Sequence, residues 1–155
     1  MQIHLIAVGN RMPDWVVSAW KDYASRLQND VTLKLIEVPA SKRSKSADLK
    51  KIQQEEGDRI LAAIPKSCRV VAMAIDGKSW STDALSEQLQ NWMQCGQDIA
   101  LLVGGPEGLS QACYQRADQR WSLSPLTLPH PMVRVIIAEQ LFRAWSILHN
   151  HPYHR

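Results

Sequence analysis

Short apolar runs alternate with segments of helical periodicity along the whole chain. Strands are predicted for the apolar runs at residues 2–8, 32–38, 69–75, 99–103 and 121–128. Helices are predicted for the segments between and after them, at residues 13–27, 47–63, 81–96, 110–120 and 132–148. This alternation predicts a single α/β domain over residues 1–155, with a mostly parallel sheet and helices on both faces.

Some of these segments are more apolar than a half-buried element requires. The runs RVVAMAI (69–75) and IALLV (99–103) contain almost no polar side chain, which is typical of strands covered on both faces. The last helix, 132–148, is apolar on more than one face and needs a second surface to bury it. The same helix of a second copy in a twofold dimer would provide that surface, and complete burial inside the chain is the alternative.

The composition is that of an ordinary globular domain. The 155 residues are 45% hydrophobic and 21% charged, and a chain of this length buries a core without disulfides or metals. Its three cysteines are widely spaced and form no CxxC pair, which favours a reducing compartment. No apolar run reaches the ~18 residues of a membrane span, and no secretory leader is visible. We therefore expect a soluble cytoplasmic protein that does not contact a membrane.

Positive charge is concentrated in two regions of the chain. The net charge of +3 is too small to indicate nucleic-acid binding by itself. Residues 40–51 carry five basic side chains against one acid, and they include Lys42, Arg43 and Lys45. The last 35 residues carry four histidines and three arginines against one acid, the arginines being Arg134, Arg143 and Arg155. Both regions could bind a polyanion, or the first could be an ordinary solvated loop and helix start.

The run GGPEG at residues 104–108 directly follows the predicted strand 99–103. Ligand sites in parallel sheets lie at the carboxyl ends of the strands. Glycines there allow the backbone to approach a ligand closely and to offer N–H donors, although a tight turn would use the same residues. The run is neither a Walker A loop nor a GxGxxG fingerprint, so kinase and classical dinucleotide-binding functions are weak alternatives.

Residues 121–130, WSLSPLTLPH, combine apolar side chains with small hydroxyls and two prolines. Pro125 lacks a ladder donor, so the run is a short strand or an extended loop and not a regular central strand. A bound adenine-like ligand would satisfy its backbone groups. An ordinary loop crossing the core is the alternative.

The terminal run NHPYHR (150–155) concentrates titratable and aromatic side chains where chain ends are normally polar and frayed. No Cys or carboxylate cluster lies near its histidines in sequence, which disfavours a metal site. Proton transfer or hydrogen bonding to a base or phosphate is one interpretation. Docking of the tail on the core or on a partner subunit is the other.

Several of these segments together resemble one known family. RlmH-type ribosomal RNA large-subunit methyltransferases, small bacterial members of the SPOUT class, are similar to this chain in the runs HLIAVGNRMPDWV, PASKRSKSADLKK, LLVGGPEGLS, WSLSPLTLPHPMVRVIIAEQLFRAWSI and NHPYHR. The resemblance covers essentially all 155 residues. It implies methylation of N3 of a pseudouridine in 23S ribosomal RNA of assembled ribosomes, with S-adenosyl-L-methionine as the cofactor. It also implies a C-terminal trefoil knot and a homodimer, neither of which follows from hydrophobic periodicity.

The resemblance further implies which residues hold the cofactor: Met73, Gly104, Gly105, Leu123, Ser124, Pro125, Leu126, Thr127 and Leu128. In this interpretation the glycines close around the methionine moiety, and the 123–128 run surrounds the adenine. Methyl transfer from a sulfonium needs no metal. It needs alignment of the acceptor nitrogen and help in removing the proton from N3.

For the acceptor, we expect catalytic side chains in the tail, namely Tyr153, His154 and Arg155. Either Tyr153 or His154 would lie near the acceptor base, and the tail could reach the cofactor of the other subunit. RNA contacts are expected from Lys42, Arg43, Lys45, Arg134 and Arg143. The alternatives are a SPOUT-like methyltransferase of another RNA, such as transfer RNA, and a ribosome-binding protein without catalysis.

Overall fold

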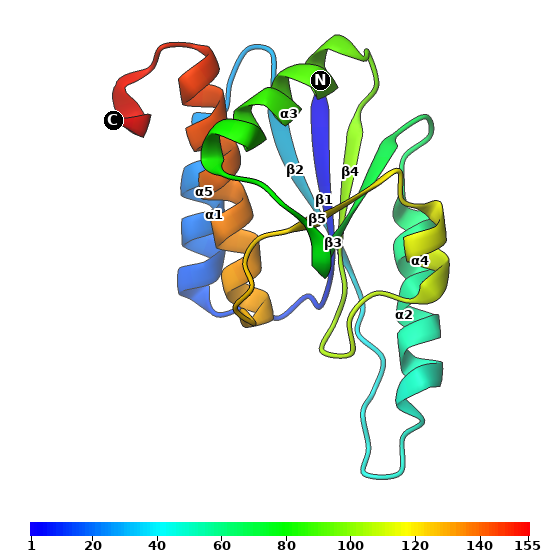
Figure 1. The fold of residues 1–155 in the computed structure, drawn as a ribbon. Helices are drawn as coiled ribbons and strands as arrows, with labels where there is room; N and C mark the ends of the chain where they lie inside the picture. Colours follow the sequence, from blue (N-terminus) through cyan, green and yellow to red (C-terminus); the bar gives the residue numbers. More distant parts are fainter.

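A five-stranded parallel sheet forms the centre of the structure, a computed structural model that describes residues 1–155 (Figure 1). Its strands are β1 (Gln2–Val8), β2 (Thr32–Val38), β3 (Arg69–Ser79), β4 (Ile99–Val103) and β5 (Gln119–Ser122). They lie in the order β2-β1-β4-β3-β5, and every neighbouring pair is parallel. This arrangement confirms the predicted α/β fold class.

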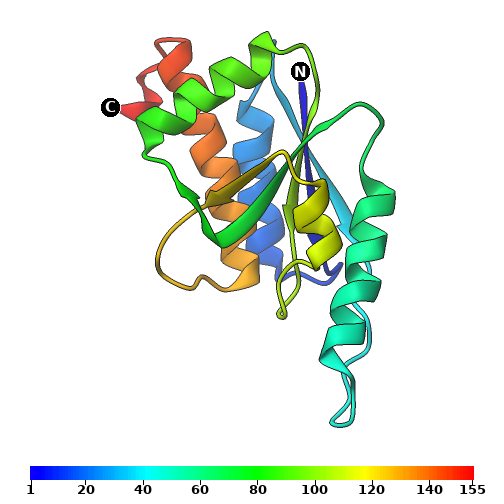
Figure 2. The same ribbon diagram turned by 45° about the vertical axis from the view of Figure 1, so that its right-hand side comes forward.

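Two layers of helices cover the sheet, one on each face (Figures 1 and 2). One layer consists of α1 (Asp14–Arg26), α3 (Thr82–Gln94) and α5 (His130–Leu148), and the other of α2 (Leu49–Ala63) and α4 (Gln111–Arg116). A short 3-10 turn, η1 (Pro152–His154), follows α5. None of the helices has both the length and the apolar character to cross a membrane.

The central strands divide their side chains between two cores. In β1, Ile3 and Leu5 pack against the layer of α1, α3 and α5, whereas Ile6 and Val8 pack against the layer of α2 and α4. Successive strand residues point to opposite faces, so a strand covered on both sides needs apolar residues at every position. All five residues of β4 are buried, as the run IALLV predicts.

Capping side chains determine where three of the helices begin. Ser81 caps α3 and Ser110 caps α4, each by accepting a hydrogen bond from the backbone N–H three residues later. Both helices therefore begin close to their predicted starts. Asp48 caps α2 in a similar way, so that helix begins at Leu49 and slightly after the predicted start.

The segment after β4 differs most from the predicted elements. The helix α4 ends at Arg116, earlier than predicted, because Asp118 already pairs with β3. The Asp118 N–H donates to the Val70 carbonyl, and the Asp118 carboxylate accepts from the Val70 N–H, both at 2.8 Å. This pairing begins β5 before the apolar run itself. Residues 123–128 form a loop, the alternative that Pro125 indicated.

The strand β3 continues past its predicted end through an irregularity between Met73 and Lys78, both of which pair with Trp121 of β5. Gly77 allows this close approach, because a Cβ there would lie 2.8 Å from the backbone nitrogen of Trp121. The residues between the two pairings bulge out of the ladder. They lie at the carboxyl edge of the sheet, where the candidate site is found.

The helix α5 packs between α1 and α3, which explains its unusual apolar content (Figure 1). Six of its apolar residues are buried inside the chain, namely Ile137, Ala138, Leu141, Phe142, Ala144 and Trp145. Burial inside the chain therefore accounts for most of the apolar surface of this helix. Met132 at the start of the helix stays 37% exposed. The homodimer and the trefoil knot stay predictions.

Candidate functional site

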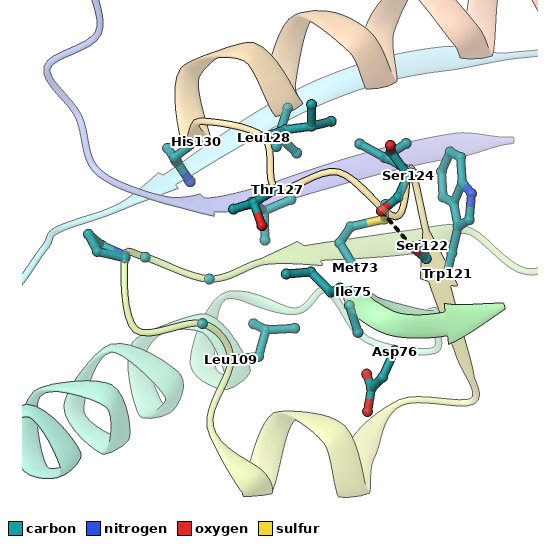
Figure 3. Close-up of a pocket in the computed structure, with 18 of the residues that line it drawn as sticks. Met73, Ile75, Asp76, Leu109, Trp121, Ser122, Ser124, Thr127, Leu128 and His130 are labelled. Atoms are coloured by element: carbon teal, nitrogen blue, oxygen red, sulfur yellow. Dashed lines mark hydrogen bonds between the residues drawn. The ribbon is translucent and has the colours of Figure 1, made fainter. Parts of the chain in front are cut away.

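A cavity of about 520 Å³ opens at the carboxyl ends of β3, β4 and β5 (Figure 3). It is lined by residues 73–76 of β3, by the glycine loop (residues 104–109) after β4, and by the 123–128 segment after β5. His130 and Val133 at the start of α5 also line it. Cofactor pockets typically enclose ~300–1,000 Å³. The cavity is therefore the candidate ligand site.

The predicted cofactor residues converge on this cavity. Eight of the nine line it: Met73, Gly104, Gly105, Leu123, Ser124, Leu126, Thr127 and Leu128. The ninth, Pro125, lies in the same segment but is not part of the wall. These residues come from three separate parts of the chain, and they meet because parallel strands place their carboxyl ends at one edge. Their contact with a cofactor stays a prediction.

The glycine loop is closed too tightly for a side chain at position 104. A Cβ on Gly104 would lie 2.4 Å from the carbonyl carbon of Gly108 and 2.6 Å from the nitrogen of Leu109. Gly108 has a φ of +79°, in the left-handed region that favours glycine, and its N–H donates to the Gly105 carbonyl at 2.9 Å. The loop is thus a tight turn whose backbone also forms a wall of the cavity.

The 123–128 segment leaves most of its backbone polar groups without a partner in the chain. No backbone–backbone hydrogen bond involves it. Its bonds are local: the Ser124 hydroxyl accepts from the Leu126 N–H at 2.9 Å, and the Ser124 carbonyl accepts from the Ser122 hydroxyl at 3.2 Å. Residues 125–127 are exposed, so without a ligand their backbone groups can bind water. The segment therefore offers N–H donors and C=O acceptors, among apolar side chains, to a ligand in the cavity.

The mouth and the floor of the cavity differ in exposure. At the mouth, Ile75 is 68% exposed and Leu126 is 72% exposed. At the floor, Trp121 is buried and stacks on Trp80, with ring centroids 5.1 Å apart. An apolar rim over a fixed aromatic floor is suited to covering a bound ligand or meeting a partner surface.

Several lining residues lie outside the predicted set, and Ile75, Leu109 and His130 are among them (Figure 3). Burial, reinforced by the nearby cation of Arg134, lowers the pKa of His130, so the ring is neutral at pH 7. The sequence signal for His130 is its position between two prolines at a helix start. The signal for Ile75 is Gly77, which marks the bulge that exposes it.

Arg134 is buried, and this corrects the expectation that it contacts RNA. Its side chain is 2% exposed, Nη1 donates to Glu37 Oε2 at 2.7 Å, and Nη2 donates to the Gly9 carbonyl at 2.8 Å. The guanidinium thus ties the first turn of α5 to the carboxyl ends of β1 and β2. A buried, paired cation stabilises the fold next to the cavity and presents no charge to a polyanion.

The other predicted RNA-binding cations fall into two groups. Lys42 and Lys45 are exposed and make no hydrogen bond or ion pair within the chain. Arg43 is paired with two glutamates. Arg143 is half-buried and donates through Nε to Glu139 at 2.9 Å. Of the five predicted RNA-binding residues, only Lys42 and Lys45 therefore have side chains that are free to contact phosphates.

The tail (residues 149–155) is docked on α5. The Tyr153 hydroxyl donates to Glu139 at 2.9 Å, and the Tyr153 ring packs on Phe142 with centroids 4.6 Å apart. Burial and the bond to Glu139 raise the pKa of Tyr153, which keeps the phenol protonated. His154 Nδ1 lies 3.1 Å from the Ser146 hydroxyl, and its Nε2 has no partner in the chain.

Within one chain, the tail follows the end of α5, whereas the loop that leads into α5 and lines the cavity lies at its opposite end (Figures 1 and 2). The cavity meets the first turn of this helix and the tail packs on its last turns. Nineteen residues at 1.5 Å each make the helix roughly 28 Å long. The structure therefore gathers the predicted cofactor residues, and separately the predicted catalytic residues, but does not bring the two groups together in one chain.

No three His, Cys, Asp or Glu side chains lie together in a way that could hold a metal ion. The expectation of a metal-independent reaction stays a prediction.

Comparison with known proteins identifies the family. A family model described as "Predicted SPOUT methyltransferase" matches residues 1–154. The chain belongs to the SPOUT methyltransferase family. Proteins named "Ribosomal RNA large subunit methyltransferase H" are 61% identical in Thioalkalivibrio sulfidiphilus, 56% in Hahella chejuensis and 55% in Marinomonas sp., each over all of this chain and at least 99% of the relative.

A solved structure supports the fold of this SPOUT family member. A probable methylase family protein from Haemophilus influenzae Rd KW20 matches with a TM-score of 0.60 and 13% identity, over 96% of this chain and 68% of that chain. The resemblance to RlmH-type SPOUT methyltransferases is thus confirmed, and with it the prediction that the protein is a methyltransferase.

Proposed function

We propose that this protein uses S-adenosyl-L-methionine to methylate N3 of a pseudouridine in 23S ribosomal RNA, acting on assembled ribosomes in the cytoplasm. The observation that carries the cofactor assignment is the cavity, where a tight glycine loop faces a segment of unpaired backbone groups. The ribosomal RNA assignment rests on the names of the three relatives, which match over the full chain.

The cavity fits this cofactor in its donor chemistry. The backbone of Gly104 and Gly105 lines the cavity and can approach a methionine moiety closely, because glycines let the loop fold tightly here. The 123–128 segment offers backbone N–H and C=O groups to the edge of an adenine, and Met73 and Leu128 offer apolar surface. When bound, the cofactor supplies a methyl group on a sulfonium, which requires no metal to activate it.

His154 is the better candidate for the base that removes the N3 proton. The bond to Glu139 and the raised pKa keep the Tyr153 hydroxyl protonated, which suits a hydrogen-bond donor more than a base. His154 is oriented through Nδ1 by Ser146 and keeps Nε2 free to accept a proton. This assignment narrows the two alternatives that the sequence left open.

A homodimer would bring the two groups of residues together. If two copies pair along α1 and α5 in opposite directions, the tail of one copy lies near the cavity of the other. Exposed apolar side chains near the cavity end of these helices support this surface: Trp15 is 54% exposed, Val17 is 40% exposed and Met132 is 37% exposed. Each active site would then combine the cofactor pocket of one chain with the tail of its partner.

The test is transfer of labelled methyl groups from S-adenosyl-L-methionine to ribosomes that lack the modification. Isolated subunits, free 23S ribosomal RNA and transfer RNA serve as competing substrates. We expect incorporation into intact ribosomes, at the N3 position when the labelled nucleoside is analysed. Incorporation into transfer RNA instead would identify a different RNA substrate, and ribosome binding without incorporation would indicate a non-catalytic protein. Either outcome would contradict the proposal.

A further inference from the structure

A buried ion-pair cluster lies directly behind the glycine loop. Glu56 of α2 is 3% exposed, and its two carboxylate oxygens are both engaged. Oε1 accepts from Arg43 Nη2 at 2.9 Å, and Oε2 accepts from the Ser41 N–H at 3.0 Å. A carboxylate this deeply buried requires a cation, and Arg43 is the one that reaches it.

Arg43 also binds the tip of the glycine loop. Its Nε lies 3.1 Å from Glu107 Oε2, and its Nη2 donates to the same oxygen, so the guanidinium engages the loop through two nitrogens. Its Nη1 donates to the Ser41 carbonyl at 3.1 Å. All three guanidinium nitrogens are therefore occupied, and the side chain is only 26% exposed. Such bidentate, charge-assisted contacts fix geometry as well as adding energy.

The cluster touches the wall of the cavity. A Cβ on Gly105 would lie 2.8 Å from Glu56 Oε1 and 3.2 Å from Arg43 Nη2, so the ion pair packs against that backbone. Gln53 of α2 reinforces the contact, since its Nε2 donates to the Glu107 carbonyl at 2.7 Å and to the Leu109 carbonyl at 3.2 Å. One face of the loop lines the cavity and the opposite face is held to α2.

We propose that Arg43 is a positioning residue for the cofactor pocket, which clamps Glu107 of the glycine loop to Glu56 of α2 and so fixes the backbone of Gly104 and Gly105. The inference rests on the proposed function of that pocket. It replaces the expectation that Arg43 meets RNA. In the same basic loop (residues 39–48), Lys42 and Lys45 keep their charges free for phosphates.

The two roles for a basic side chain predict different kinetics. Loss of a positioning contact weakens cofactor binding and raises the KM for S-adenosyl-L-methionine, and leaves the KM for ribosomes unchanged. Loss of a phosphate contact raises the KM for ribosomes and reduces the salt dependence of ribosome binding. Arg43→Lys tests the first role, because lysine keeps the charge and loses the bidentate fork. Lys42→Gln is the matched variant for the second role.

The first measurement is cofactor affinity by titration calorimetry with S-adenosyl-L-methionine. Losing charge-assisted bonds at the clamp should weaken binding roughly tenfold or more in Arg43→Lys and in Glu107→Gln. Lys42→Gln should bind the cofactor as the unaltered protein does. Glu107→Gln is included because it releases the loop without leaving Glu56 unpaired, and melting curves show whether each variant is folded. If Arg43→Lys should fail to fold, the double variant R43Q/E56Q removes the unpaired buried charge.

The second measurement is hydrogen exchange of residues 104–109 in the protein without cofactor. Faster exchange in Glu107→Gln and Arg43→Lys, with no change in Lys42→Gln, supports the clamp. Unchanged exchange and unchanged cofactor affinity in both clamp variants would overturn it, as would a raised KM for ribosomes as their sole effect. If the unaltered protein does not bind S-adenosyl-L-methionine at all, the proposed function fails, whereas the exchange experiment still decides whether Arg43 holds the loop.

Discussion

The two ends of α5 present different kinds of chemical group. At the cavity end, the groups aimed at a ligand are mainly backbone: a glycine loop and the unpaired amides of the 123–128 segment. At the tail end they are side chains, with Tyr153 held by Glu139 and His154 oriented by Ser146. Backbone surfaces provide shape and fixed donors, whereas titratable side chains handle protons. The contrast fits a cavity that binds the cofactor and a tail that removes a proton from the methyl acceptor.

Gly104→Ala should have the largest effect on cofactor affinity and should act on the cavity end alone. The added Cβ would lie 2.4 Å from the carbonyl carbon of Gly108, so the loop must move away from its present position. Because the displaced loop loses its contacts with the methionine moiety, we expect cofactor affinity to fall by ~10–100-fold, or about 1.4–2.8 kcal/mol. Calorimetric titration of the folded variant measures it.

Gly96→Ala is the control for this substitution. Gly96 has a φ of +74°, and no heavy atom lies within 4 Å of the position that a Cβ would take. Alanine there strains the backbone without a clash and far from the cavity. It should lower the melting temperature and leave cofactor affinity intact. Equal affinity in Gly104→Ala and the unaltered protein would show that the glycine loop does not bind the cofactor.

Deletion of residues 153–155 should abolish methylation and leave most of the cofactor affinity. A general base contributes ~10²–10⁴-fold, so His154→Gln alone should lower kcat by at least roughly 100-fold. Tyr153→Phe should be milder, because the hydroxyl that it removes is protonated and bound to Glu139. Single-turnover methylation of ribosomes compares the three variants. Retained activity in the deletion would remove the tail from the mechanism.

Glu139→Gln should loosen the tail without touching the cavity. The Glu139 carboxylate accepts hydrogen bonds from Tyr153, Arg143 and Gln140. The change therefore weakens the hydrogen bond that holds Tyr153 of the tail on α5. Losing one charge-assisted bond of this kind should lower kcat about 10-fold, with the cofactor affinity unchanged. Glu87→Gln is a suitable comparison because Glu87 is exposed on α3 and should have no measurable effect. An equal loss in cofactor affinity would contradict the separation of the two ends.

The sequence predicts the cavity end better than the tail end for a physical reason. Strand edges, glycines and Pro125 are local signals, and the parallel sheet brings the marked loops to one edge. The bulge of β3 is not local, because it depends on Trp121 passing close to Gly77. Apolar runs therefore located the loops but did not predict which of their residues, such as Ile75, stay at the rim.

Charged residues show the limit of sequence reasoning most clearly. In the sequence, Arg134 and Arg43 are basic residues like Lys42. In the structure, Arg134 is paired with Glu37, and Arg43 is paired with Glu56 and Glu107, all of them distant in sequence. A count of basic residues cannot separate a free cation from a paired one. The difference depends on tertiary contacts, and it changes which residues are expected to meet RNA.

The smallest expected effects concern pH, and they have opposite signs at the two ends. Burial lowers the pKa of His130 from 6.5, so the unfolded chain takes up a proton more readily than the folded one below that value. The contribution of His130 to stability is therefore present above pH 6.5 and lost as the pH falls toward its folded pKa. At the tail, the pKa of Tyr153 is raised from 10.0, so its contribution is present below pH 10 and lost as the pH rises.

Melting temperatures across the pH range test both signs. His130→Gln should flatten the loss of stability between pH 7 and pH 5, which is about the range in which an ordinary histidine titrates. His4 needs separate treatment in the acid range, since burial lowers its pKa also. His4→Gln should act additively, because His4 lies on β1 and His130 lies at the start of α5. Tyr153→Phe should flatten the alkaline loss instead. If His130→Gln changed the alkaline loss of stability, or Tyr153→Phe changed the acid loss, the two ends of α5 would be coupled.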